Sequence, residues 1–189
     1  MIPRPLPGWS FLRAACALLL LAALALAAQA AQAAAQASAP LLLDDRTGVV
    51  EAWPAVTTLD DPNGTLDIDA VLAAGARFAL PQTAYATMGM HRGVLWLRIP
   101  VSVPAHSTAR WILDIDYAVL NRVEMFVVVD GRVHQHGLAG NLQPANGAAR
   151  SPRTPALILD LAPGKRHDIY MRIENAGPKI LPIRLSQAS

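Results

Sequence analysis

The sequence predicts an all-β domain, an antiparallel sandwich with one short helix near its start, and three observations lead to this fold class. Short segments rich in apolar, β-branched or aromatic residues recur along the chain. Their separators carry Pro, Gly or Asn, and no helical pattern lies between them. About seven to nine such strands, with turns roughly every 8 to 15 residues, are typical of a sandwich and not of a parallel sheet.

The first predicted strand covers residues 47–53 and is ended by Pro54. The later strands cover residues 95–101, 110–117, 122–129, 132–139, 154–161, 166–175 and 180–185. Alternation is clearest over residues 111–117, where the apolar side chains share one face and the two acids take the other. Asp130-Gly131 predicts a tight hairpin, because both turn positions tolerate positive φ.

The helix is predicted over residues 70–74, after a segment dense in turn formers. Asp67 or Asp69 can cap it, and Gly75 ends it. Residues 61–69 superficially resemble a calcium-binding loop. With Gly64 at the obligatory turn position, however, the first and last ligands would be Leu59 and Ala70, so a turn followed by a helix cap explains the segment better.

The first 37 residues have the layout of a secretory signal peptide. Arg4 and Arg13 precede an apolar run over residues 14–28, which is followed by small-residue exits at 28–30 and 35–37. This run is shorter than the roughly 20 residues that a membrane-spanning helix needs. The alternative, a retained signal anchor, is disfavoured because the run is Ala-rich and ends in Gln. We therefore expect a signal peptide over 1–37, export to the periplasm and one domain over 38–189.

Charge and cysteine content exclude several classes of function. After removal of the leader the chain carries 14 basic and 14 acidic residues, without a run of Lys or Arg. A near-neutral domain of this kind has no field that attracts phosphate backbones, so nucleic acid is a poor candidate partner. Cys16, the one cysteine, is removed with the leader, so the mature domain is expected to form no disulfide and no thiolate metal site. No cofactor is expected.

The candidate ligand-binding residues are Trp96, Arg98, Tyr117 and Arg172. Trp96 and Arg98 lie two apart on a strand, so an indole and a guanidinium share one face and could bind a sugar ring and its hydroxyls or a carboxylate. Alternatively, Trp96 fills the core and Arg98 pairs with an acid at the sheet rim. Arg172 repeats the aromatic-x-Arg spacing with Tyr170.

Other chemistries find less support in the sequence. The long loop predicted over residues 140–155 carries Arg150 and Arg153, which are placed to contact an anionic ligand. His134 and His136 have ligand-like spacing on a strand, but no third metal ligand lies near them in the sequence, so a solvent-facing strand is the favoured interpretation. No nucleophile elbow or catalytic cysteine is present. A carboxylate pair for glycoside hydrolysis stays open, because such pairs meet only in space.

One set of ordered segments runs from about Leu42 to Leu185: residues 51–54, 59–62, 93–98, 111–117, 121–126, 137–140, 161–164, 170–172 and 181–183. In this order they resemble the second type of extracellular sensory domain of bacterial seven-transmembrane receptors with diverse intracellular signalling modules. The resemblance implies a jelly-roll sandwich similar to carbohydrate-binding modules, held outside the cytoplasmic membrane. It also implies a small-molecule ligand, a sugar among the candidates, and a membrane-embedded receptor portion or partner.

In such receptors seven membrane helices and an output domain follow, whereas this sequence stops at Ser189. It is therefore either a fragment of a receptor or a sensory domain encoded alone. The leading hypothesis is a non-enzymatic, periplasmic ligand-sensing domain. The alternative is a free secreted carbohydrate-binding protein without signalling output, and a glycosidase comes third.

Overall fold

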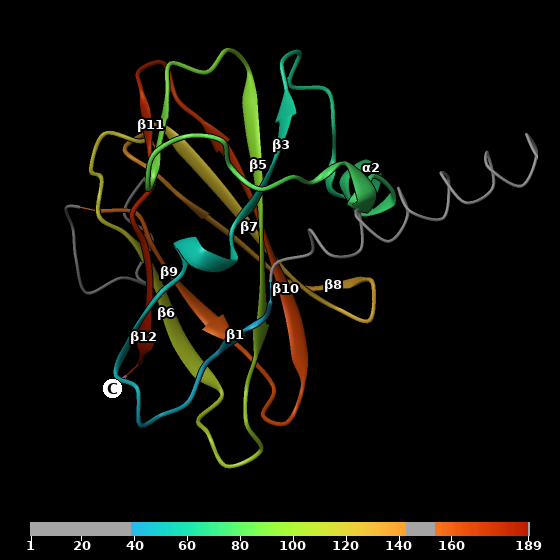
Figure 1. Cartoon of the computed structure of the whole chain (residues 1–189), viewed down its shortest axis with the longest axis vertical. Helices are drawn as coiled ribbons and strands as arrows, with labels where there is room; N and C mark the ends of the chain where they lie inside the picture. The colour runs from blue at the N-terminus through green and yellow to red at the C-terminus, as the bar shows by residue number, and fades with distance from the viewer. Residues whose placement is uncertain (1–38, 143–153, 189) are drawn as a thin grey trace, which may run out of the picture. The chain divides into compact units, whose positions relative to one another are not determined.

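Two β-sheets pack face to face in the computed structural model, which describes residues 39–142 and 154–188 (Figure 1). The six-stranded sheet holds β1 (Leu41–Leu42), β3 (Thr57–Asp61), β5 (Val94–Ser102), β10 (Arg166–Glu174), β7 (Arg122–Val129) and β8 (Arg132–Ala139). The four-stranded sheet holds β2 (Val49–Glu51), β12 (Ile183–Gln187), β6 (Arg110–Ile115) and β9 (Ala156–Asp160). A separate pair joins β4 (Thr87–Gly89) to β11 (Lys179–Ile180).

The connections are those of a jelly roll, as expected. The chain crosses between the two large sheets from β5 to β6, from β6 to β7, from β8 to β9 and from β9 to β10. Pairing is antiparallel except between β1 and β5, which run parallel. The predicted leader over 1–37, Arg150, Arg153 and most of the predicted loop over 140–155 lie outside the described residues.

The main core lies between the two sheets and follows from strand alternation. On β5 the residues Leu95, Leu97 and Ile99 are fully buried there, and they face Leu113 and Ile115 of β6 within the same cluster. Gln135 links the edges of the sheets: its Nε2 donates to the Ile158 carbonyl at 2.7 Å, and its Oε1 accepts from the Asp160 N–H at 3.0 Å. One side-chain amide thus ties β8 to β9.

A second, smaller apolar cluster covers the outer face of the six-stranded sheet. Trp96, Phe126 and Tyr170 form its sheet side, and Val71 of α2 (Ile68–Ala73) packs on them. α2 is the one α-helix of residues 39–142 and 154–188, and none of their helices is long and apolar enough to cross a membrane. Asp67 caps it, since its Oδ1 accepts from the Ala70 N–H at 2.8 Å.

Short 3₁₀ turns complete the structure at Trp53–Ala55 (η1) and Gly75–Arg77 (η2). The predicted bounds of β7 and β8 are confirmed, and so is the hairpin between them, where Asp130 and Gly131 have φ of 50° and 73°. The strand predicted over residues 47–53 is shorter, Val49–Glu51, and the helix predicted over residues 70–74 begins earlier, at Ile68. Two further predictions were wrong. The turn-forming segment from Leu59 begins as strand β3, because pairing with β5 overrides the turn propensity of its acids. The predicted last strand is two strands, β11 and β12, separated by Pro182, which cannot donate to a ladder.

Candidate functional site

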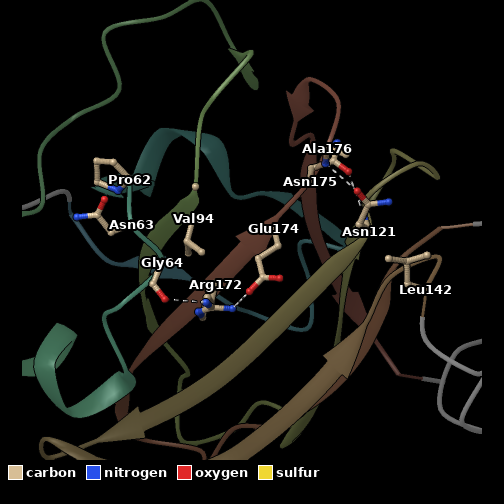
Figure 2. Close-up of a pocket in the computed structure, with 11 residues that line it drawn as sticks. Pro62, Asn63, Gly64, Val94, Asn121, Leu142, Arg172, Glu174, Asn175 and Ala176 are labelled. Atoms are coloured by element: carbon tan, nitrogen blue, oxygen red, sulfur yellow. Dashed lines mark hydrogen bonds and ion pairs between the residues drawn. The ribbon is translucent and has the colours of Figure 1, made fainter.

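A cavity of about 480 Å³ lies at one end of the six-stranded sheet, on the outer face (Figure 2). Segments far apart in the sequence meet there: the turn after β3, the start of β5, the loop before β7 and the end of β10. The lining residues are Pro62, Asn63, Gly64, Gly93, Val94, Asn121, Leu142, Arg172, Glu174, Asn175 and Ala176. Five of the eleven carry hydrogen-bonding side chains, so the lining is a mixture of polar and apolar groups.

One wall consists of the turn after β3 packed against the loop before β5. The buried Asp61 carboxylate shapes the turn, because it accepts from the N–H groups of Thr65 at 3.1 Å and Leu66 at 2.9 Å. At Gly93, where φ is 70°, a Cβ would lie 2.4 Å from the Pro62 carbonyl oxygen. The two segments therefore touch backbone to backbone, which requires glycine at this position.

The opposite wall is held by a reciprocal pair of asparagines. The Asn121 N–H donates to Asn175 Oδ1 at 3.0 Å, and Asn121 Oδ1 accepts from the Ala176 N–H at 2.7 Å. Asn175 Nδ2 donates to the Pro178 carbonyl at 2.7 Å. These bonds fix the loop between β6 and β7 to the turn between β10 and β11.

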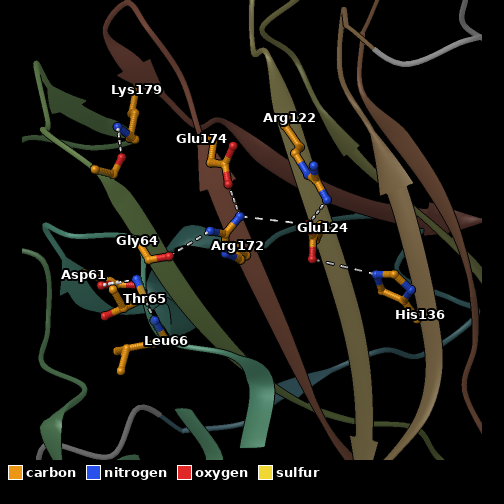
Figure 3. A network of polar contacts seen from close by, with 11 residues as sticks. Asp61, Gly64, Thr65, Leu66, Arg122, Glu124, His136, Arg172, Glu174 and Lys179 are labelled. Carbon is orange, nitrogen blue, oxygen red and sulfur yellow. Dashed lines mark hydrogen bonds and ion pairs between the residues drawn. The ribbon is translucent and has the colours of Figure 1, made fainter. Parts of the chain in front are cut away.

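Arg172 lies between the walls and is surrounded by acceptors (Figure 3). Its side chain is 16% exposed and pairs with Glu174 on its own strand and with Glu124 of β7 at 3.9 Å. Its Nη2 donates to the Gly64 carbonyl at 3.4 Å, which ties the turn after β3 to the sheet. Glu124 also pairs with Arg122, so the two arginines and two carboxylates form one network.

Lys179 supports the cavity wall from β11. Its side chain is fully buried, and its Nζ donates to the carbonyls of His91 at 2.8 Å and Gly93 at 3.3 Å. Burial lowers the pKa of this ammonium group, while the charge of Asp60 acts in the opposite direction. Because Gly93 lines the cavity, Lys179 connects the wall directly to the segment that leads into β12.

The structure brings three of the four predicted ligand-binding residues onto one sheet face. Arg172 is the register partner of Trp96, and Tyr170 is the register partner of Arg98, so Trp96, Arg98 and Arg172 all project from the outer face. Of the three, Arg172 lines the cavity. Trp96 is fully buried in the second cluster, and Arg98 pairs with Asp168 at 3.0 Å. The alternative interpretation therefore describes both residues better, with Trp96 in the outer cluster instead of the main core.

Tyr117 lies apart from that face. It follows β6, in the other sheet, and packs half-buried against the main core. A ligand-binding role for Trp96, Arg98, Tyr117 and Arg172 remains a prediction. The asparagine pair and Glu174 were missed from the sequence, although Asn121 and Asn175 both lie at strand boundaries, where the loops of a sandwich meet.

His134 and His136 are exposed on β8, and His136 stacks on Phe126 with ring centroids 4.7 Å apart. His136 Nε2 lies 3.9 Å from a Glu124 carboxylate oxygen. Over residues 39–142 and 154–188 no group of three or more His, Cys, Asp or Glu side chains is arranged to hold a metal ion.

The fold and the cavity define the class of this protein, a jelly-roll domain with a cavity of mixed polar and apolar lining among its end loops. The chain belongs to the family of 7TMR-DISM extracellular 2 domains, whose sequence model matches residues 54–187. The resemblance found in the sequence is thereby confirmed, and the chain is an extracellular domain of the kind that these receptors carry. A comparison with curated proteins gave no match.

Solved structures with similar regions include large glycosidases. One from Bacteroides fragilis, assigned as a β-galactosidase, is 12% identical with a TM-score of 0.46 over 72% of this chain and 22% of that one. A β-glucuronidase from Ruminococcus gnavus, bound to a C6-substituted uronic isofagomine, is 10% identical with a TM-score of 0.41 over 74% and 29% of the chains. The chain spans less than a third of these proteins. Likeness at this level carries no argument about activity.

Proposed function

We propose that this chain is the periplasmic ligand-sensing domain of a bacterial seven-transmembrane receptor and that its cavity binds a small polar ligand. Membership of a family of extracellular receptor domains supports the sensory part. The observation that carries the binding part is the cavity of about 480 Å³. This volume lies within the usual range of about 300 to 1,000 Å³ for small-molecule sites.

A sugar is the ligand class that suits the cavity best. Asn121, Asn175, Arg172 and Glu174 contribute amide, guanidinium and carboxylate groups, which together donate and accept hydrogen bonds. A sugar hydroxyl can do both at once, so it can bridge such groups without leaving one unpaired. Val94 and Leu142 add apolar surface for the ring carbons. The proposal includes no catalytic step, in keeping with a sensory family.

A structural change caused by ligand binding can be transmitted to the rest of the molecule through β11 and β12. Glu174, Asn175 and Ala176 line the cavity, and the short turn after them leads into β11 and β12. Lys179 links β11 back to the Gly93 wall. A ligand that prefers one spacing of these two walls therefore biases the position of β12, since only differential affinity for two states can shift their populations.

The binding proposal is tested by titrating the wild-type domain with D-glucose, D-galactose and L-arabinose while amide chemical shifts are followed by NMR. We expect shifts at Gly64, Asn121 and Asn175. Arg172→Gln should abolish them, whereas Arg98→Gln, on the same face but outside the cavity, should retain them. No response to any sugar, or equal loss in both variants, would overturn sugar binding in the cavity. Turnover of a glycan would overturn the non-enzymatic assignment.

The receptor part is tested by reading the coding DNA beyond the Ser189 codon. Seven hydrophobic segments there would support a receptor. An immediate stop codon would favour the alternative, an exported carbohydrate-binding protein without signalling output of its own.

A further inference from the structure

We propose that Glu174 makes the cavity reject anionic groups, so that the ligand presents uncharged hydrogen-bonding groups to Arg172. This inference deepens the proposed function and rests on it for the identity of the site. It runs against the first expectation for a guanidinium in a cavity, since arginine is the residue most suited to bidentate binding of carboxylates and phosphates.

The argument begins with the partners that Arg172 already has. Glu174 pairs with it from the same strand, Glu124 lies 3.9 Å from it, and the Gly64 carbonyl accepts a third contact at 3.4 Å. The guanidinium is thus met by two carboxylates and a carbonyl oxygen before any ligand arrives. An anion that binds the remaining N–H groups of the guanidinium would therefore lie close to two carboxylates.

The two carboxylates differ in how free they are to move. Glu124 is 14% exposed and is held by Arg122, its neighbour on the same face of β7. Glu174 is 40% exposed and lines the cavity. Glu174 is therefore the carboxylate that an incoming ligand meets, and Glu124 stays in place behind Arg172.

Among residues 39–142 and 154–188, the charges next to the cavity balance. Among the lining residues Arg172 is matched by Glu174, and behind them Arg122 is matched by Glu124. In the wall formed by the turn after β3, the buried Lys179 and the buried Asp61 carry opposite charges. The next charged groups on this face, Arg98 and Asp168, also pair with each other. An anion would consequently gain no net attraction and would meet two carboxylates. An uncharged hydroxyl can instead accept a hydrogen bond from Arg172 and donate one to Glu174, so the Arg172–Glu174 ion pair is preserved.

Acetate titrations of the wild-type domain and of two variants, followed by amide chemical shifts at pH 7.5, test this assignment. Glu174→Gln keeps the shape of the side chain and removes its charge, while Glu124 remains to pair with Arg172. Asp168→Asn is the matched control, because it removes a carboxylate from an Arg pair on the same strand and face but outside the cavity. Thermal unfolding of both variants checks that they fold.

We expect acetate to bind Glu174→Gln at least about tenfold more tightly than wild type, the effect of removing one like charge at contact distance near a protein surface. The shifts should fall on Gly64, Asn121 and Asn175, and Asp168→Asn should show none there. Equal acetate affinity in wild type and Glu174→Gln would overturn the proposal. So would the absence of acetate binding from both, because Glu174 would then not be what excludes anions.

The sugar titrations are separate, so the two proposals can fail independently. If the wild-type domain binds no sugar but Glu174→Gln binds acetate more tightly than wild type, sugar binding is refuted and the rejection of anions by Glu174 stands. If the domain binds sugars and the two acetate affinities are equal, sugar binding stands and the rejection of anions by Glu174 is refuted.

Discussion

Replacement of Trp96 tests whether the outer face of the six-stranded sheet carries a second core or an open aromatic platform. Trp96 is fully buried beneath α2 and stacks on Phe126 with ring centroids 6.0 Å apart. Truncating a buried aromatic side chain to alanine costs about 3 to 5 kcal/mol. We therefore expect Trp96→Ala to lower the free energy of unfolding by at least about 3 kcal/mol.

Trp96→Phe should cost far less, for a reason specific to this site. The Trp96 Nε1 atom is buried and has no hydrogen-bond partner among the described residues. The change to phenylalanine removes two buried carbons, which lowers the free energy of unfolding by about 1.6 kcal/mol. It also removes an unsatisfied donor, which raises the free energy of unfolding by about 1 to 3 kcal/mol. The two terms nearly cancel, so Trp96→Phe should remain within about 1.5 kcal/mol of wild type.

Urea unfolding followed by far-UV circular dichroism measures both variants without reliance on tryptophan fluorescence. A Trp96→Ala variant that loses less than about 1 kcal/mol would refute the burial argument, because exposed sites change stability by only about 0.5 kcal/mol. If such a variant kept its stability and lost sugar binding, that result would support the prediction of Trp96 as a ligand-binding residue. A Trp96→Phe variant as unstable as the alanine variant would contradict the gain in stability assigned to removing the unsatisfied indole N–H.

Two further predictions concern buried titratable groups. Burial is the main cause that lowers the pKa of His167 below its ordinary 6.5, and its Nε2 accepts from the Ala162 N–H at 3.0 Å. The unfolded chain therefore takes up the proton first, so stability should fall as the pH drops below about 6.5, by at most about 1.4 kcal/mol per pH unit. Urea melts between pH 7.5 and 5 should show a shallower fall in His167→Gln, and equal slopes would contradict the assignment. Burial also lowers the pKa of Lys179 below 10.5, so stability should rise as the pH approaches that value from below. Lys179→Met should remove this rise and speed amide exchange over residues 91–93, whereas unchanged exchange would show that the ammonium does not hold the cavity wall.

Local patterns were sufficient for most of the fold. The period of two over residues 111–117 located the inward face of β6, and Asp130-Gly131 located the hairpin that joins β7 to β8. Both signals are properties of a few adjacent residues, and at these two places the tertiary pairing agrees with them. β3 was missed because its acids favour a turn locally, and only its partner β5 makes it a strand.

The sequence by itself determined the sandwich class, the ranges of its main strands and the fact that Trp96 and Arg98 share one face. It could not determine which face that is, because both faces of the six-stranded sheet carry a buried apolar cluster: one packs on the second sheet and the other lies under α2. Only the tertiary structure decided that Trp96 belongs to an outer core and that Arg172 reaches a cavity. That cavity is formed where Gly64, Asn121 and Glu174 meet. Their proximity arises from strand pairing across long sequence separations, which no local pattern encodes.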